Sequence, residues 1–371
     1  MTVPLVDEKE STGTHPLTLR QRVRRRLFPP GGRREAAARR LKHGVRRAPS
    51  WAVTQVRRAL AWSTRLRWRI QAWLGRELRR ALVAVARALA PRPLKAFYRR
   101  FRSERQFPDR SEVVVYASTA LNYDTELPRR SLEAAAARRT VQVSLVTTVR
   151  DEASNLQTWL DSLLAQARLP DEVIIVDGGS RDGTLEALQA AAEQIDRPAL
   201  HVISAPGANI AQGRNLAIRQ ASSPVVVSTD LGCTLDPEWL ERLVAPFEDD
   251  PEIVMSAGYY GTLEGRPWDR LVRRFFVADL DQVDAQRFLP STRSVAFRKS
   301  LWAQVGGIPE SLTFAGEDTL FGLMAKARPG RWAFVPEARV FWHGPSSPRR
   351  LWRTVVRYAR GDGEAGIFAS A

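Results

Sequence analysis

The sequence predicts an α/β fold in which a mixed, mostly parallel sheet carries helices on both faces and follows a basic helical N-terminal region. From Val141 onward, β-branched runs alternate with amphipathic stretches of helical period, which is typical of a sheet covered by helices. The charge also changes at Val141. Residues 1–140 hold 33 Lys and Arg against 11 Asp and Glu, whereas the remainder holds 24 against 29. The net charge of +17 therefore belongs to the first part of the chain.

The expected elements follow one another at short intervals after the composition change. Each strand is a run rich in Val and Ile, and each helix repeats its apolar residues every three or four positions. Acidic residues follow several of the strands, at the edge where open α/β sheets bind ligands. The expected strands cover residues 143–149, 172–176, 201–204, 225–228 and 339–341, and the expected helices cover 156–165, 184–195, 213–221 and 320–327.

The basic N-terminal part divides into two segments. Residues 1–50 are Arg-rich and broken by Pro29-Pro30-Gly31-Gly32, so we expect a disordered arm. Residues 51–140 are interpreted as a basic amphipathic helical region and linker, because Trp and Leu recur at helical spacing with Arg between them. Such a helix suits an anionic membrane surface. A helical hairpin packed on the following domain is equally consistent, and nucleic acid is the least favoured partner.

The compartment is predicted from segments that the sequence lacks. No apolar run approaches the roughly 18 to 20 residues that span a bilayer. Acidic Asp7, Glu8 and Glu10 precede any basic or apolar block, which is the reverse of a secretory signal. The single cysteine, Cys233, excludes an intramolecular disulfide. We therefore expect a cytoplasmic protein, peripheral on the inner face of the cell membrane.

Five short motifs occur in a fixed order after Val141. They are Val143-Ser144-Leu145 through Asp151-Glu152, Val176-Asp177-Gly178-Gly179-Ser180-Arg181-Asp182-Gly183-Thr184, Gly213-Arg214-Asn215, Thr229-Asp230, and Gly316-Glu317-Asp318. Each motif is weak alone, but a series over about 175 residues is specific. In order and spacing they resemble the family-2 glycosyltransferases of the GT-A fold. The resemblance implies a GT-A domain over residues 141–345 and a nucleotide diphosphate sugar as donor.

The resemblance also implies which residues bind the donor. Asp177 would accept hydrogen bonds from the base or ribose, with Asp151 and Glu152 beside it. Arg214 opens a helix near the same edge and would neutralise the diphosphate, an interpretation favoured over a solvated charge at the helix end. Asp182 is better explained as a helix cap in Asp-Gly-Thr.

A divalent cation, Mg²⁺ or Mn²⁺, is the implied cofactor. Asp230 stands where the family places an acidic metal-binding motif, but the second acid of that motif is missing. One carboxylate, phosphate oxygens and water can still hold a hard cation. His343 resembles the late histidine that some GT-A enzymes add as a ligand, although a lone histidine beside Trp342 more often has a structural role.

The implied reaction is displacement at the anomeric carbon with inversion, and it needs a base for the acceptor hydroxyl. Asp318 resembles that base, and Glu317 is its supporting neighbour. Two acids at a helix N-terminus also occur for electrostatic reasons alone. A degenerate domain that serves as a membrane- or partner-binding scaffold is the alternative function, although such a domain has no reason to keep these acids together.

The last segment, residues 346–371, is predicted to form a basic amphipathic helix that either closes over the diphosphate or lies on lipid. The acceptor is expected to be a hydroxyl compound, with lipid-linked acceptors included, of the kind used in cell-surface polysaccharide or glycolipid synthesis. The sequence names neither the sugar nor the acceptor. A single transfer per binding event is expected, because the transmembrane helices of processive relatives are missing.

Overall fold

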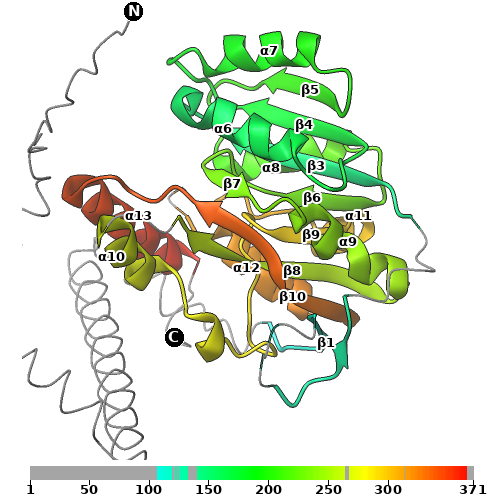
Figure 1. Ribbon diagram of the computed structural model, residues 1–371. Coiled ribbons are helices and arrows are strands. Elements are labelled where there is room, and N and C mark those ends of the chain that lie inside the picture. Colours follow the sequence, from blue (N-terminus) through cyan, green and yellow to red (C-terminus); the bar gives the residue numbers. More distant parts are fainter. Residues whose placement is uncertain are drawn as a thin grey trace, which may run out of the picture. The chain divides into compact units, whose positions relative to one another are not determined.

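The computed structural model describes residues 107–365, except 119–120, 122, 124, 133–139, 264–266 and 314 (Figure 1). The expected arm over residues 1–50 and the expected helix within 51–90 lie outside this range. None of the helices in the described range is long and apolar enough to cross a membrane.

The described residues form a ten-stranded mixed sheet with the order β2-β1-β10-β8-β9-β6-β3-β4-β5, and β7 pairs with β10. Most neighbours are parallel, and the antiparallel pairs are β6 with β9, β8 with β9 and β7 with β10. The predicted mixed, mostly parallel sheet is therefore confirmed. The strands are β1 (Ser111–Tyr116), β2 (Arg129–Arg130), β3 (Val143–Val149), β4 (Glu172–Asp177), β5 (Ala199–Ser204), β6 (Val225–Ser228), β7 (Cys233–Leu235), β8 (Ile253–Thr262), β9 (Val295–Arg298) and β10 (Gly330–Trp342).

Helices cover both faces of the sheet, as Figure 1 shows. Those predicted from the apolar period are found within about three residues of the expected positions. Several helices pack on strands other than the one that precedes them: α8 packs on β3 and β4, α9 on β8 and β10, and α7 on β5. The helices are α6 (Ala153–Leu164), α7 (Thr184–Gln194), α8 (Ile210–Gln220), α9 (Trp239–Asp249), α10 (Pro267–Phe276), α11 (Lys299–Val305), α12 (Glu317–Lys326) and α13 (Pro348–Glu364), with a 3₁₀ turn η1 (Leu280–Gln282).

The alternation of side chains along the central strands divides the core into two layers. In β4, Val173 and Ile175 join the layer beneath α6, α7 and α9, whereas Ile174 and Val176 join the layer beneath α8, α11 and α12. Because successive strand residues point to opposite faces, a continuous apolar run requires a sheet covered on both sides. This burial fixes the register and hence the positions at which the strands end.

The sheet begins earlier in the chain than the composition change at Val141. Strand β1 lies within the segment that we expected to be helical region and linker, and it pairs in parallel with β10. Its residues alternate between the two core layers, with Val113 and Val115 on one side and Val114 and Tyr116 on the other. We did not predict this strand, because its buried apolar centre is short and charged residues surround it in the sequence.

Candidate active site

Acidic residues meet at the edge where β3, β4 and β6 end. These strands run parallel, so Asp151, Asp177 and Asp230, which end or follow them, lie along one edge. The close packing of α8 on β3 brings Arg214 to the same place. A Cβ on Gly213 would lie 2.3 Å from the Thr148 hydroxyl, so only glycine permits this approach.

The carboxylate of Asp177 is held by the turn that follows β4. One oxygen accepts hydrogen bonds from the Gly179 and Ser180 amides, at 2.9 and 3.0 Å, and the other accepts from the Ser180 hydroxyl. The side chain is fully buried. The structure thus places this predicted nucleotide-binding residue inside the loop, where it fixes the loop's backbone.

The loops after β3 and β4 are joined through Asp151. Its Oδ1 accepts from the Arg181 amide at 2.8 Å, and its own amide donates to the Ser180 hydroxyl at 2.9 Å. Asp151 has a φ of 56°, which is uncommon for a residue other than glycine. Asp182 adds the capping contact that its sequence suggests, because it accepts from the Thr184 amide at 3.1 Å.

Glu152 lies beside the loop that follows β6. A Cβ on Gly232 would lie 3.9 Å from the Glu152 carboxylate, which also accepts from the Asn155 amide group at 2.6 Å. Burial raises the pKa of Glu152, and the negative charge of Asp230 raises it further. Glu152 and Asp230 are therefore close enough to repel each other.

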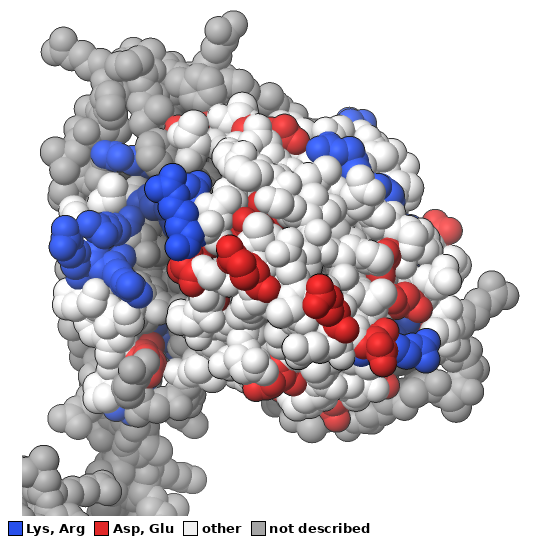
Figure 2. All heavy atoms as spheres, turned by 90° about the horizontal axis from the view of Figure 1, so that it is seen from above, with Lys and Arg blue, Asp and Glu red and all other residues white. Residues whose placement is uncertain are grey.

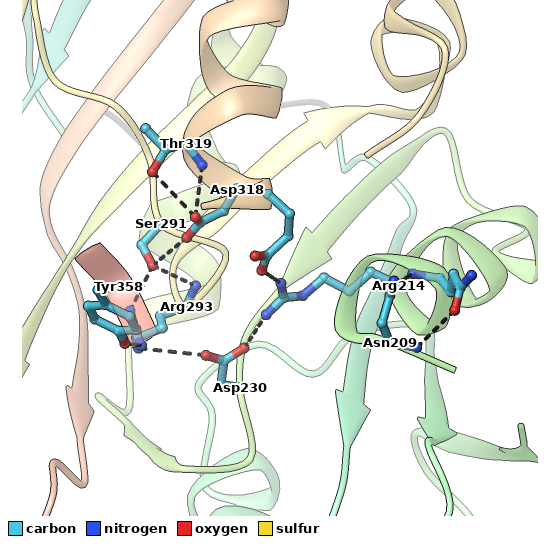
Figure 3. A network of polar contacts seen from close by, with 10 residues as sticks. Asn209, Arg214, Asp230, Ser291, Arg293, Asp318, Thr319 and Tyr358 are labelled. Atoms are coloured by element: carbon cyan, nitrogen blue, oxygen red, sulfur yellow. Dashed lines mark hydrogen bonds and ion pairs between the residues drawn. The ribbon is translucent and has the colours of Figure 1, made fainter. Parts of the chain in front are cut away.

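Arg214 connects two of the predicted site motifs (Figure 3). Its Nη1 donates to Glu317 and its Nη2 donates to Asp230, both at 2.7 Å, and its side chain is 1% exposed. Burial works against the ionised form of Asp230, but Arg214 and Arg293 hold the pKa of this carboxyl below its ordinary value. The end of β6 and the start of α12 are thus bound to one guanidinium.

Glu317 and Asp318 differ in environment although they are adjacent. Glu317 is buried, and burial together with the charge of Asp318 raises its pKa despite the contact with Arg214. Asp318 is half-buried. One of its oxygens accepts from the Thr319 amide at 2.8 Å, and the other lies 3.4 Å from the Ser291 hydroxyl. Of the two, Asp318 is the more accessible.

His343 follows β10 and lies near Gly232, whose carbonyl accepts from the His343 amide at 2.8 Å. Its ring nitrogens are 2.8 Å from the Thr234 hydroxyl and 3.4 Å from the Asn155 side-chain oxygen. Burial lowers the pKa of His343, so the ring is neutral at pH 7 and has the protonation state of a metal ligand. The ring also lines a cavity of about 490 Å³.

The fit of a divalent cation depends on Asp230 and its neighbours. Within residues 107–365, apart from the gaps given above, no three His, Cys, Asp or Glu side chains gather closely enough to hold a metal ion. Asp230 nevertheless has one oxygen that no guanidinium hydrogen-bonds, and the nearby charge of Glu152 would be relieved by a cation. The residues suit a weakly held ion whose remaining ligands come from a phosphate and water.

Sequence reasoning missed Arg293 and Tyr358 as parts of this site. Arg293 precedes β9 and lies 3.6 Å from Asp230, and it donates to the Tyr358 hydroxyl of α13 at 2.8 Å. Arg293 lies outside the five motifs, so no pattern in the sequence assigned it a role. Helix α13 was expected to be basic, but an inward-facing tyrosine in a basic helix gives no signal of its own.

Comparison with known proteins agrees with this arrangement. Residues 144–304 match the family model described as Glycosyl transferase family 2. An undecaprenyl-phosphate 4-deoxy-4-formamido-L-arabinose transferase of Pseudomonas fluorescens (strain Pf0-1) is 32% identical over 140 residues, which cover 36% of this chain and 38% of the relative. The O-antigen biosynthesis protein RfbC of Myxococcus xanthus is 28% identical over 239 residues, which cover 57% of this chain and 18% of that protein. The chain thus spans less than two fifths of the length of these relatives.

Solved structures give a weaker likeness. The mannosyltransferase PcManGT from Pyrobaculum calidifontis, solved in complex with GDP-Man and Mn²⁺, is similar with a TM-score of 0.47 and 19% identity, covering 75% of this chain and 71% of that one. A structure of S. aureus TarS, residues 1–349, has a TM-score of 0.44 and 19% identity, and the coverage is 60% and 66%.

Proposed function

We propose that the chain transfers a sugar, with inversion, from a nucleotide diphosphate donor to an acceptor hydroxyl, because residues 144–304 match the family model described as Glycosyl transferase family 2. The observation that carries the proposal is the bridge made by Arg214. It joins Asp230, in the part of the chain that the family model matches, to Glu317, which lies beyond the matched residues.

Asp318 is the proposed general base. As the acceptor oxygen bonds to the anomeric carbon, its proton passes to the Asp318 carboxylate, and the bond to the nucleotide diphosphate breaks on the opposite side. Glu317 supports this step by fixing the start of α12 to Arg214. The half-buried position of Asp318 supports the assignment, since a base must reach the acceptor.

The nucleotide is proposed to bind along the loops after β3 and β4. Asp151 and Glu152 are the carboxylates proposed to contact the nucleotide directly. Asp177 is proposed to act by holding the loop between Gly178 and Ser180 in its binding conformation, since its oxygens accept hydrogen bonds from that loop. Arg214 is proposed to fix Asp230 near the diphosphate.

A divalent cation, Mg²⁺ or Mn²⁺, would be held by Asp230, with His343 as a second candidate ligand. When bound, such an ion offsets negative charge on the departing diphosphate. The partners of His343 support a structural role as well, because Thr234 and Asn155 lie near both ring nitrogens. Metal binding by the His343→Ala variant distinguishes the ligand role from the structural one.

A screen of nucleotide sugars tests the proposed activity. The full chain is incubated with each donor and with Mg²⁺ or Mn²⁺, and release of the nucleoside diphosphate is measured with and without candidate acceptors. We expect turnover of one donor class, and Asp318→Asn should lower transfer from it about 10² to 10⁴-fold. A chain that turns over no donor under any of these conditions would support the scaffold alternative.

An anionic membrane surface is the proposed location, at the inner face of the cell membrane, with a lipid-linked acceptor. Figure 2 shows Lys and Arg gathered at the left-hand side, where α10 and α13 lie in Figure 1. Leu271 and Trp352 of these helices are 40% and 42% exposed, and Arg349, Arg350 and Arg353 are exposed beside them. Exposed Trp and Leu with surrounding Arg suit the headgroup region of a bilayer.

Vesicle binding tests this location. The full chain should sediment with vesicles that contain anionic lipid, less with neutral ones, and the bound fraction should fall as salt rises. A combined Arg349→Gln, Arg350→Gln and Arg353→Gln variant should bind more weakly if α13 contributes. Equal binding to neutral vesicles, or tighter salt-sensitive binding to DNA, would contradict the proposal.

A further inference from the structure

Arg293 is a mostly buried arginine whose guanidinium lies near two aromatic rings. Its side chain is 14% exposed, and its guanidinium lies 5.0 Å from the Tyr260 ring centroid and 4.8 Å from that of Trp342. Contact with two aromatic rings favours the cation and limits the directions in which its N–H groups can point. The guanidinium is therefore held in place before any ligand binds.

The hydrogen bonds of Arg293 leave one of its three nitrogens, Nε, without a hydrogen-bond partner among the described residues. Its Nη2 donates to the Tyr358 hydroxyl at 2.8 Å, and its Nη1 donates to the Ser291 hydroxyl at 3.1 Å. Its Nε is buried and has no hydrogen-bond partner among the described residues, since the Asp230 oxygen is 3.6 Å away. A buried cationic donor without an acceptor costs free energy unless an anionic oxygen reaches it.

The two arginines at Asp230 differ in how far their charge is compensated. Arg214 donates to two carboxylates at 2.7 Å, whereas Arg293 has its nearest carboxylate at 3.6 Å and hydroxyl groups at its other nitrogens. The positive charge of Arg293 is thus the less neutralised of the two. Of these side chains, Arg293 is better placed than Arg214 to meet additional negative charge.

Helix α13 sets the orientation of this guanidinium. Tyr358 packs edge-on against Phe276, with ring centroids 5.5 Å apart, and Phe276 packs likewise on Trp342 at 5.4 Å. One turn later, a Cβ on Gly361 would lie 2.1 Å from the Ala315 carbonyl, so α13 also contacts the loop that precedes Glu317 and Asp318. The same helix therefore positions Arg293 and borders the proposed base.

We propose that Arg293 binds an oxygen of the donor's diphosphate through its unpartnered Nε, and that Tyr358 is the positioning residue that orients it. This inference rests on the proposed function, because it assigns the ligand of the same site. Figure 3 shows the geometry: Arg293 and Tyr358 lie on one side of Asp230, and Arg214 lies on the other. Charge neutralisation of the leaving group would then come partly from the chain itself.

Calorimetry with nucleotides that differ in phosphate number tests the assignment. UDP, GDP, UMP, GMP and inorganic pyrophosphate are titrated into the full chain and its variants. Arg293→Gln should weaken binding of the preferred diphosphate about tenfold or more and change binding of the matching monophosphate much less. Arg293→Lys should discriminate less between diphosphate and monophosphate, because lysine keeps the positive charge without the planar guanidinium group. Tyr358→Phe should cause a smaller loss of the same kind.

Two controls make the result decisive. Arg219→Gln, at an exposed position near the end of α8, should bind every ligand as the wild type does, and thermal melting should show which variants are folded. Equal weakening of diphosphate and monophosphate by Arg293→Lys or Tyr358→Phe, or no weakening at all, would overturn the inference while leaving the proposed function intact. Wild-type binding of pyrophosphate that needs Arg293, without binding of any nucleotide, would support the anion site and contradict the proposed function. No binding of any of these ligands to the wild type would contradict both.

Discussion

The carboxylates at the ends of β4 and β6 are stabilised in opposite ways. Asp177 accepts hydrogen bonds from the amides and hydroxyl of its own turn, and it is fully buried. Asp230 is bound by a guanidinium from another element and remains 25% exposed. A carboxylate satisfied by its local backbone shapes a loop, whereas one held by a distant arginine can exchange that contact for a ligand. The site therefore has two parts. One is the loop after β4, which Asp177 holds in shape, and the other is a charged network of Asp230, Arg214 and Glu317.

The largest effect on activity is expected at Asp318, which is adjacent to Glu317 of the charged network. Asp318→Asn should lower transfer about 10² to 10⁴-fold and leave donor affinity nearly unchanged, because a base acts on the acceptor hydroxyl. Turnover at saturating donor and acceptor measures the first quantity, and calorimetry measures the second. Asp161→Asn, on the exposed side of α6, is the matched control. If Asp318→Asn keeps near wild-type turnover, another residue is the base, and Glu317 is the first candidate.

Asp230 should show the next largest effect, and on binding. Asp230→Ala removes a partner of Arg214 and the proposed ligand of the cation, so we expect donor affinity to fall about tenfold or more, together with loss of divalent-ion binding. Calorimetry with Mn²⁺ and with donor measures both. His343→Ala should reproduce the loss of metal binding only if the histidine is a ligand. Full activity in EDTA would contradict the proposed cofactor.

Asp177 should instead affect the fold of its loop. Asp177→Asn turns one acceptor oxygen into a donor that faces backbone N–H groups, so the free energy of unfolding should fall by about 1 to 3 kcal/mol. Donor affinity should fall as well, while turnover at saturating donor changes less. Chemical denaturation and donor titration measure these effects, with exposed Asp196→Asn as control. Unchanged stability would mean that the turn does not depend on this carboxylate.

The smallest effect is expected at Glu317, and it depends on pH. Its pKa is raised in the folded state, so its ionisation lowers stability as pH rises above the ordinary value of 4.5. The free energy of unfolding of Glu317→Gln minus that of the wild type should therefore be larger at pH 7 than at pH 4. The difference should be about 1 kcal/mol or less. Unfolding free energies at both pH values, with exposed Glu193→Gln as control, provide the measurement. The opposite pH trend would show that Arg214 dominates the ionisation of Glu317.

The sequence by itself predicted the succession from β3 to β6 with α6, α7 and α8, and also α12 and the end of β10, because the apolar period is set by residues close together in the chain. This period predicted none of the elements from β7 to α11. The sequence also placed Asp151, Asp177 and Asp230 at the ends of strands. It predicted a helix from residue 320, shortly after the two adjacent acids, whereas α12 begins at Glu317. Motif order suggested that these residues share a site. None of this required knowledge of which side chains touch.

Only the tertiary structure decided the contacts within the site. Arg214 and Glu317 are 103 positions apart, and Arg293 and Tyr358 are 65 apart, so neither pairing leaves a local pattern. The addition of β1 to the sheet depends likewise on β10, far along the chain. Burial of Asp177 within its own turn depends on how that turn folds against the neighbouring loop. Local periodicity encodes elements, whereas charge pairing between elements depends on packing that brings distant residues together.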